Sequence, residues 1–312
     1  MAPVRWTALV TSYVRANDGR RLAVNLSGDQ SGEPVVFLHG TPGSRLRPLP
    51  REQVLEELGI WLISFDRPGY GRSDRLQSRT VADVAQDVAA IADSLGLDTF
   101  AVIGRSGGGP HALACAALLP DRVTRAAAMM SLAPWRAAGL EWFDGMADSN
   151  VLAYRTAADE PDLLIRHLIE AAGEINADPV SHVAVISPEM PEVDRRIVAD
   201  ANVRALLAQN FAEALRYSAD GWIDDVLAFC SPWGFDVSSI KRPVLLWHGE
   251  RDVFSPVAHS EWLASKIRGA HVMIQPNDAH FGALEAVGDV LSWLLSDPAL
   301  ASRPSQDAAL TH

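Results

Sequence analysis

Short apolar runs rich in β-branched residues alternate with helical patterns from about residue 11 to 134 and again after residue 243. The runs that predict strands lie at residues 35–38, 60–65, 100–103, 126–132, 244–247 and 272–275. The helical patterns lie at residues 80–95, 112–119, 256–267 and about 281–295. Strands that alternate with helices in this way predict an α/β fold with a mostly parallel central sheet flanked by helices.

The clearest helical pattern covers residues 80–95. Its apolar side chains recur at steps of three and four residues: Val81, Val84, Val88, Ile91 and Leu95. Thr80 stands directly before them, and a threonine hydroxyl often accepts the first free N–H groups of a helix, so we expect Thr80 to cap this one.

The pattern changes between about residues 135 and 235, where strand-like runs are few and helical stretches carry many charges and large aromatic residues. This predicts a helical cap (135–235) inserted after the sixth canonical strand, which is the run at 126–132, into a core formed by 1–134 and 236–298, with 299–312 a disordered tail. Trp142, Phe143 and Met146 can share one helical face. They are candidates to line an apolar substrate pocket, although such residues more often pack a cap onto the core.

Composition narrows the possible partners. The chain has 312 residues and a formal net charge of −12, which argues against nucleic acid and against anionic membrane surfaces. No apolar stretch is long enough to span a membrane, and the N-terminus lacks the pattern of a secretory signal. The two cysteines, Cys115 and Cys230, do not make a disulfide framework. We therefore expect a cytoplasmic monomer or homodimer that acts on a small molecule.

One glycine-rich turn has the composition of a nucleophile site. Ser106 lies between a predicted strand and a predicted helix, with Gly104 two residues before it and Gly108 two residues after it. A sharp strand-to-helix turn exposes a serine hydroxyl, and small residues at these two positions relieve its crowding. The helix that follows directs free N–H groups at any negative charge that develops there. We predict that Ser106 is a catalytic nucleophile.

A serine nucleophile needs a base and an acid that orients it. His280 follows the strand predicted at 272–275, and Asp252 follows the strand predicted at 244–247. Both therefore belong to the edge of the sheet at which parallel strands end and open α/β folds build their sites. We predict His280 as the base and Asp252 as the acid, with Glu250 and Asp278 as alternative acids.

The oxyanion formed in acyl transfer needs two N–H donors. Gly107 supplies one directly after the serine, and we expect Thr41, in the turn between Gly40 and Pro42, to supply the other. His39 precedes this turn, and we interpret it as a structural residue that holds the turn in place. The histidines lack the spacing of metal ligands and nothing resembles a nucleotide-binding loop, so we expect neither metal nor cofactor.

These residues resemble the α/β-hydrolase superfamily, in its cap-bearing serine hydrolase branch. The resemblance rests on five segments in order: His39-Gly40-Thr41-Pro42, Asp66-Arg67-Pro68-Gly69-Tyr70-Gly71-Arg72-Ser73, the turn at Ser106, His248-Gly249-Glu250-Arg251-Asp252 and Ala279-His280-Phe281. It implies that Asp66 and Arg67 brace the site. A serine in place of an aspartate nucleophile distinguishes the chain from haloalkane dehalogenases and soluble epoxide hydrolases. The turn at Thr41 is similar to that of proline iminopeptidases, but Thr41 replaces its middle glycine and the nucleophile turn differs.

Three functions are compatible with this pattern. The first is hydrolysis of an ester, lactone or thioester of a small, mainly apolar molecule through an acyl-enzyme on Ser106. The second uses the same triad for lyase, C–C bond hydrolase or perhydrolase chemistry. In that case Arg105 and Arg45 would hold an anionic substrate, unless they form ion pairs with neighbouring carboxylates. The third is a ligand-binding protein without activity.

Overall fold

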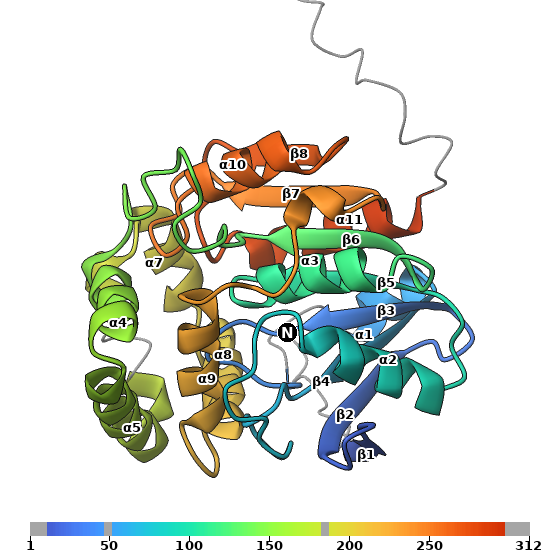
Figure 1. Ribbon diagram of the computed structural model, residues 1–312, viewed down its shortest axis with the longest axis horizontal. Helices are drawn as coiled ribbons and strands as arrows, with labels where there is room; N and C mark the ends of the chain where they lie inside the picture. Colours follow the sequence, from blue (N-terminus) through green and yellow to red (C-terminus); the bar gives the residue numbers. More distant parts are fainter. Residues whose placement is uncertain (1–10, 47–51, 182–186, 297–312) are drawn as a thin grey trace, which may run out of the picture.

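The computed structural model describes residues 11–46, 52–181 and 187–296, and its centre is an eight-stranded sheet in the order β1-β2-β4-β3-β5-β6-β7-β8 (Figure 1). The strands are β1 (Thr11–Arg15), β2 (Arg21–Gly28), β3 (Glu33–Leu38), β4 (Ile60–Phe65), β5 (Phe100–Arg105), β6 (Val123–Met129), β7 (Val244–Gly249) and β8 (His271–Gln275). Strand β2 pairs antiparallel with both β1 and β4, and every other pair is parallel. The predicted α/β fold with a mostly parallel sheet is confirmed.

Helices cover both faces of the sheet. They are α1 (Glu52–Glu57), α2 (Val84–Ser94), α3 (Gly108–Leu118), α10 (Ala258–Lys266) and α11 (Ala283–Leu295), with a short 3-10 helix, η2 (Val237–Ser239). Alternate residues of each strand face opposite sides, so Val36 and Val102 pack with α2 and α3, whereas Val35 and Ala101 pack with α1 and α11. Burial on both faces explains why the central strands read as continuous apolar runs.

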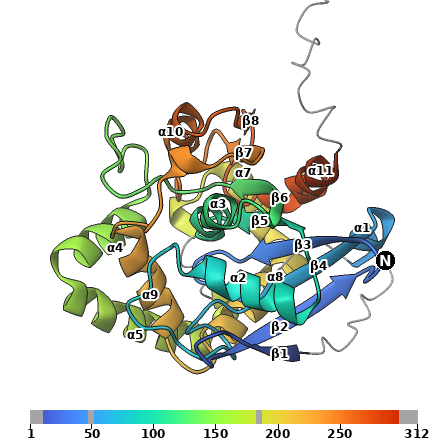
Figure 2. The same ribbon diagram turned by 45° about the vertical axis from the view of Figure 1, so that its right-hand side comes forward.

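Further helices lie between β6 and β7. They are α4 (Asp148–Asp159), α5 (Pro161–Ala177), η1 (Ser187–Glu189), α7 (Glu192–Ala199), α8 (Ala201–Ala214) and α9 (Asp220–Phe229). In Figure 1 they gather beyond the ends at which the parallel strands point, and Figure 2 shows α4, α5 and α9 there from a second direction. We call residues 148–229 the helical segment. It falls inside the predicted cap, whose limits at 135 and 235 stay a prediction, and the predicted tail 299–312 lies outside the described residues.

Three predicted boundaries are wrong in informative ways. Strand β6 ends at Met129, three residues short of the predicted end, because Met130 has a φ of +47° and leaves the extended conformation. Helix α3 begins at Gly108, four residues earlier than predicted, because it starts directly at the turn. Thr80 does not cap α2; its own N–H and hydroxyl donate to Asp83 Oδ2 at 2.7 and 2.9 Å, and α2 begins after Asp83.

None of the helices within the described residues is long and apolar enough to cross a membrane. Cys115 and Cys230 are both free thiols.

Candidate active site

Ser106 occupies a strained turn at the end of β5. Its φ is +53°, in the left-handed region that a residue with a Cβ rarely adopts. The turn is held by hydrogen bonds from the N–H of Ser106 to Met129 O at 2.8 Å and from the N–H of Gly109 to Ser106 O at 2.7 Å. These contacts fix the backbone on both sides of the hydroxyl, and Ser106 lines a cavity.

The two flanking glycines are required by close backbone contacts. A Cβ on Gly104 would lie 2.1 Å from Gly108 O, and a Cβ on Gly108 would lie 2.1 Å from Leu38 O. Both distances are far below van der Waals contact. The backbone packs so closely at this turn that only glycine fits at either position. The glycine spacing around Ser106 predicts such a turn.

His280 and Asp252 lie in direct contact. Nδ1 of His280 is 2.8 Å from Asp252 Oδ2, and the other carboxylate oxygen accepts the N–H groups of Phe254 at 2.8 Å and Ser255 at 3.1 Å. Burial opposes ionisation of Asp252, but His280 and the nearby His248 outweigh it and hold the pKa of Asp252 well below its usual range. Asp252 is thus an ionised, oriented partner that keeps Nε2 of His280 available for chemistry.

Thr41 and Gly107 lie side by side at the cavity wall. A Cβ on Gly107 would come within 2.2 Å of Thr41 Oγ1. Neither backbone N–H has an acceptor among the hydrogen bonds of the described residues. Gly107 also directly precedes helix α3, whose N-terminal end favours negative charge. An N–H group at a helix N-terminus and a second one from the adjoining Thr41 turn, both without an acceptor among the described residues, are suited to hold an oxyanion beside Ser106.

His39 braces the turn that carries Thr41. It is buried, its Nδ1 lies 2.8 Å from Gly40 O, and its Nε2 accepts the N–H of Arg67 at 3.1 Å. One ring nitrogen therefore donates and the other accepts, as in a neutral imidazole. Burial, aided by the Arg67 guanidinium, lowers the pKa of His39 well below its ordinary value. His39 is a structural residue here.

Asp225, on helix α9, is a buried centre of charge that the sequence reasoning missed. Its carboxylate receives side chains from several loops and from α3: Thr41 (2.6 Å), Arg67 (2.5 Å), Tyr70 (2.8 Å), Arg79 (2.7 Å) and His111 (3.2 Å). Burial opposes its ionisation, but Arg67 and Arg79 outweigh that effect and hold the pKa of Asp225 well below the usual range. Asp225 thus fixes the turn of Thr41 from the helical segment. In the sequence, its burial is indicated only by the apolar neighbours Ile223 and Val226.

Asp194, on helix α7, makes a comparable contact with the backbone of His280 and Phe281. Its carboxylate accepts the backbone N–H of His280 at 3.1 Å and that of Phe281 at 2.8 Å. Burial raises the pKa of Asp194, an effect that His280 and the two N–H groups partly offset. Nothing in the charged sequence around Asp194 marks it as a buried residue, so sequence reasoning did not find it.

The cavity next to Ser106 has a volume of about 340 Å³. Its wall includes Thr41, Arg105, Gly107 and His280. Much of the rest is apolar: Tyr154, Leu168, Leu207 and Phe211 come from the helical segment, and Leu132 and Phe254 lie outside it. The predicted nucleophile, base, N–H donors and Arg105 therefore meet in one mainly apolar space large enough for a small molecule.

The expectation for Trp142, Phe143 and Met146 is wrong. None of the three lines this cavity. The Trp142 ring packs edge-on against Phe143 and His259, and its Nε1 donates to Ala133 O at 3.0 Å. Trp142 and Met146 are buried in the hydrophobic core. These residues therefore have a packing role, which was the alternative to lining the pocket.

Arg45 does not face the cavity either. It is buried, and its Nη1 contacts Asp66 at 2.5 Å and Glu213 at 2.6 Å. Asp66 also accepts the N–H groups of Arg45 and Arg72, at 2.7 and 3.0 Å. Arg45 and Asp66 are thus neutralised structural groups that brace the loop after β4.

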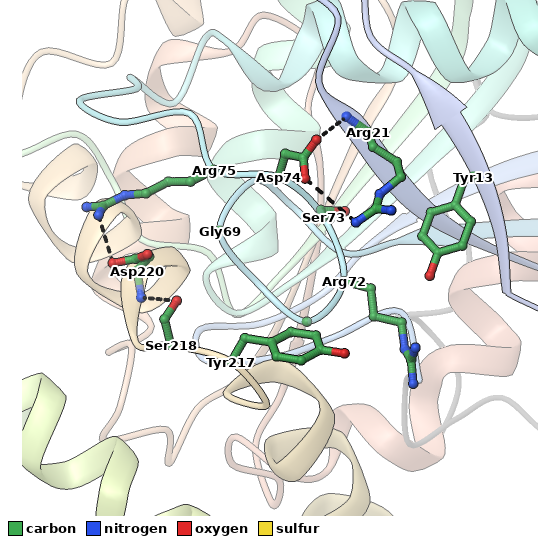
Figure 3. Close-up of a pocket in the computed structure, with 11 residues that line it drawn as sticks. Tyr13, Arg21, Gly69, Arg72, Ser73, Asp74, Arg75, Tyr217, Ser218 and Asp220 are labelled. Carbon is green, nitrogen blue, oxygen red and sulfur yellow. Dashed lines mark hydrogen bonds and ion pairs between the residues drawn. The ribbon is translucent and has the colours of Figure 1, made fainter.

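A second, polar hollow of about 220 Å³ lies where the loop after β4 meets the start of α9 (Figure 3). Its arginines are paired with carboxylates: Arg21 with Asp74, Arg75 with Asp220 and Asp224, and Arg72 with Glu213. Among the residues that the structure describes, every arginine that lines this hollow therefore has a carboxylate partner, in contrast to the arginine at the Ser106 cavity.

Comparison with known proteins agrees with this fold. Residues 33–287 match the family model described as the alpha/beta hydrolase fold. The chain belongs to the α/β-hydrolase fold family. Among α/β hydrolases of known structure, it is similar to the enol-lactonase from Burkholderia xenovorans LB400, at 19% identity and a TM-score of 0.67, over 92% of this chain and 100% of that one. It is equally similar to the esterase EaEST from Exiguobacterium antarcticum, at 24% identity and a TM-score of 0.66, with the same coverage.

Curated sequences give a similar result. The chain is 24% identical to the uncharacterized hydrolase YcgS of Bacillus subtilis over 81% of this chain and 86% of that protein. It is 33% identical to the proline iminopeptidase of Xylella fastidiosa over 41% of each chain. The iminopeptidase match thus covers less than half of either protein. Sequence identities and coverages as low as these establish the fold alone.

Proposed function

We propose that this protein hydrolyses an ester-type bond, in an ester, lactone or thioester of a small molecule, through Ser106, His280 and Asp252. The observation that carries the proposal is the contact of His280 Nδ1 with the ionised, buried Asp252, beside a cavity that is lined by His280, Ser106, Thr41 and Gly107. These are the parts that acyl transfer requires.

The reaction follows from the roles of these atoms. The Ser106 hydroxyl attacks the carbonyl carbon while Nε2 of His280 takes its proton, and Asp252 stabilises the imidazolium that forms. The negative charge on the carbonyl oxygen is held by the N–H groups of Thr41 and Gly107. Collapse expels the alcohol, which receives the proton from His280. Water activated by His280 then attacks the acyl-enzyme, releasing the acid and restoring Ser106.

The lining of the cavity favours an ester over an aminopeptidase substrate. An aminopeptidase must bind the α-ammonium group of its substrate, and a buried ammonium needs a carboxylate beside it. The cavity wall of the described residues includes no aspartate or glutamate and includes the cation of Arg105. Such a wall disfavours a free ammonium group, whatever the resemblance to iminopeptidases in part of the chain.

The test is an assay of the purified protein against 4-nitrophenyl esters of increasing acyl length, together with a serine-directed fluorophosphonate probe. We expect the wild type to hydrolyse short esters and to take the label. Ser106→Ala should lose the label and lower kcat by at least about a thousandfold, and Asp252→Asn should lower kcat by a similar factor by misorienting His280.

The outcomes separate the alternatives. Labelling of Ser106 without turnover of any ester would point to lyase or C–C bond chemistry at the same triad. If neither labelling nor turnover occurs and Ser106→Ala behaves like the wild type, the site is not catalytic and the proposal is wrong.

A further inference from the structure

Arg105 lies directly beside the nucleophile and faces the cavity. It is the last residue of β5, precedes Ser106 in the chain and is half-buried. Its guanidinium group stacks over the ring of Phe281 at 5.4 Å from the centroid. The only hydrogen bond that it makes among the described residues is a long one, from Nη2 to His280 O at 3.5 Å.

The other buried arginines near the site are neutralised, and Arg105 is not. Arg45 contacts two carboxylates directly, and Arg67 and Arg79 share the carboxylate of Asp225. Within the described part of the chain, Arg105 forms no ion pair, and its buried Nε has no partner. Its guanidinium group therefore keeps most of its donors unused next to a mainly apolar wall.

The nearest carboxylates have other partners. Asp252 binds His280 and two backbone N–H groups, and Asp194 binds the N–H groups of His280 and Phe281. They attract Arg105 from a distance, but burial outweighs them and lowers the pKa of Arg105 to about 10. The guanidinium group is thus charged at neutral pH without a direct counter-ion. An anion that enters the cavity would stabilise its charge.

We propose that Arg105 binds a carboxylate carried by the substrate, so that the enzyme acts on monoanionic esters or lactones. This inference rests on the hydrolase function proposed above. A guanidinium group with free donors in a partly dry cavity holds a carboxylate through two parallel hydrogen bonds. Because Arg105 and Ser106 line the same cavity of about 340 Å³, a substrate that reaches both has its carboxylate and scissile carbonyl joined by a short spacer, as in a half-ester of a short dicarboxylic acid.

The experiment compares two substrates that differ in charge but hardly in shape: monoethyl glutarate and its neutral amide, ethyl glutaramate. We expect the wild type to show a kcat/KM at least about tenfold higher for the half-ester. Arg105→Met should lower kcat/KM for the half-ester about 10- to 100-fold and change it for the amide by less than about threefold. Arg105→Lys should give an intermediate value, because it keeps the charge without the paired donors.

Arg166→Met is the matched control, because it removes the same charge from an exposed position on α5 and should change neither substrate. Equal losses for both substrates in Arg105→Met, or a wild-type preference for the amide, would overturn the inference.

A calorimetric titration of Ser106→Ala with monoethyl glutarate, with and without Arg105→Met, tests the carboxylate site without turnover. Binding that is lost with Arg105→Met supports the inference even if the wild type hydrolyses no ester and the hydrolase proposal fails. Binding that is the same in both variants overturns it.

Discussion

Asp194 of helix α7 accepts the backbone N–H of His280 at 3.1 Å, so a residue of the helical segment holds the main chain of the proposed base. The same carboxylate accepts the next N–H, that of Phe281, at 2.8 Å. The side chain of His280 is oriented by Asp252, and its backbone is oriented by Asp194. The position of the imidazole therefore depends on two separate carboxylates, only one of which touches the ring.

Asp194→Ala should act on catalysis more than on binding. Loss of both hydrogen bonds frees the His280 loop, and a displacement of about 1 Å can cost on the order of a hundredfold in rate. We expect kcat to fall about 10- to 100-fold with KM changed by less than about threefold, and Asp194→Asn to recover part of the loss. Steady-state kinetics on a short ester checks this. Glu192→Ala, exposed on the same helix, is the control, and an unchanged kcat in Asp194→Ala would contradict a positioning role.

Asp225→Asn should destabilise the fold. It keeps the size of the side chain but leaves Arg67 and Arg79 buried without their counter-ion, which costs about 3–5 kcal/mol of unfolding free energy. Because folding lowers the pKa of Asp225, its contribution is complete above the unfolded carboxyl pKa of about 4 and is lost as the pH falls below that value. Urea unfolding at several pH values should show a difference between wild type and variant that is constant near neutrality and shrinks below about pH 4. A difference independent of pH would show that the charge of Asp225 is not responsible.

Gly108→Ala should prevent the turn at Ser106 from forming, because its Cβ would lie 2.1 Å from Leu38 O. We expect loss of fluorophosphonate labelling and a fall in the unfolding midpoint. Gly173→Ala, inside α5, is the comparison, since no atom lies within 4 Å of its Cβ position. That change should stabilise the protein by about 0.5–1 kcal/mol. A Gly108→Ala variant as stable and reactive as the wild type would refute the packing described here.

Ala153→Phe should shorten the acyl chain that the site accepts. Ala153 lines the cavity from α4, and a phenyl ring there would occupy part of its volume of about 340 Å³. We expect the preferred 4-nitrophenyl ester to shift to a shorter acyl group, with kcat/KM for the shortest ester reduced by less than about threefold. Leu152→Phe lies one position earlier and is 63% exposed, so it should leave the profile unchanged. An unchanged profile in Ala153→Phe would mean that acyl chains do not enter this cavity.

The parts of the site that sequence predicts are those with local chemical signatures. Gly104 and Gly108 around Ser106 reflect a turn that tolerates no other residue, and the order of Asp252 and His280 reflects strands that end at a common edge. The choice of Asp252 over Glu250 and Asp278 is supported by its contact with His280. The central strands were also predictable, because strands that are buried on both faces of a sheet consist of continuous apolar residues.

The remainder depends on contacts between distant parts of the chain. Asp194 and Asp225 look like surface carboxylates in the sequence, and only the placement of α7 and α9 against the loops of the site buries them. Trp142 and Phe143 show the opposite error: they were candidates for the pocket wall, but they pack against each other. An apolar helical face in the sequence does not indicate whether it lies against the core or against a cavity. The antiparallel β1 received no prediction of its own, since it is a short edge strand with few buried side chains.

The attachment of the helical segment through Asp194 and Asp225 has a consequence for protein engineering. A recombination experiment that exchanges the segment between β6 and β7 would treat it as a module that carries substrate preference alone. In this chain the insertion also carries carboxylates that fix the backbone of His280 and the turn of Thr41. A chimera that receives a foreign insertion without acidic side chains at these two places would keep its nucleophile and lose the alignment of the groups that serve it.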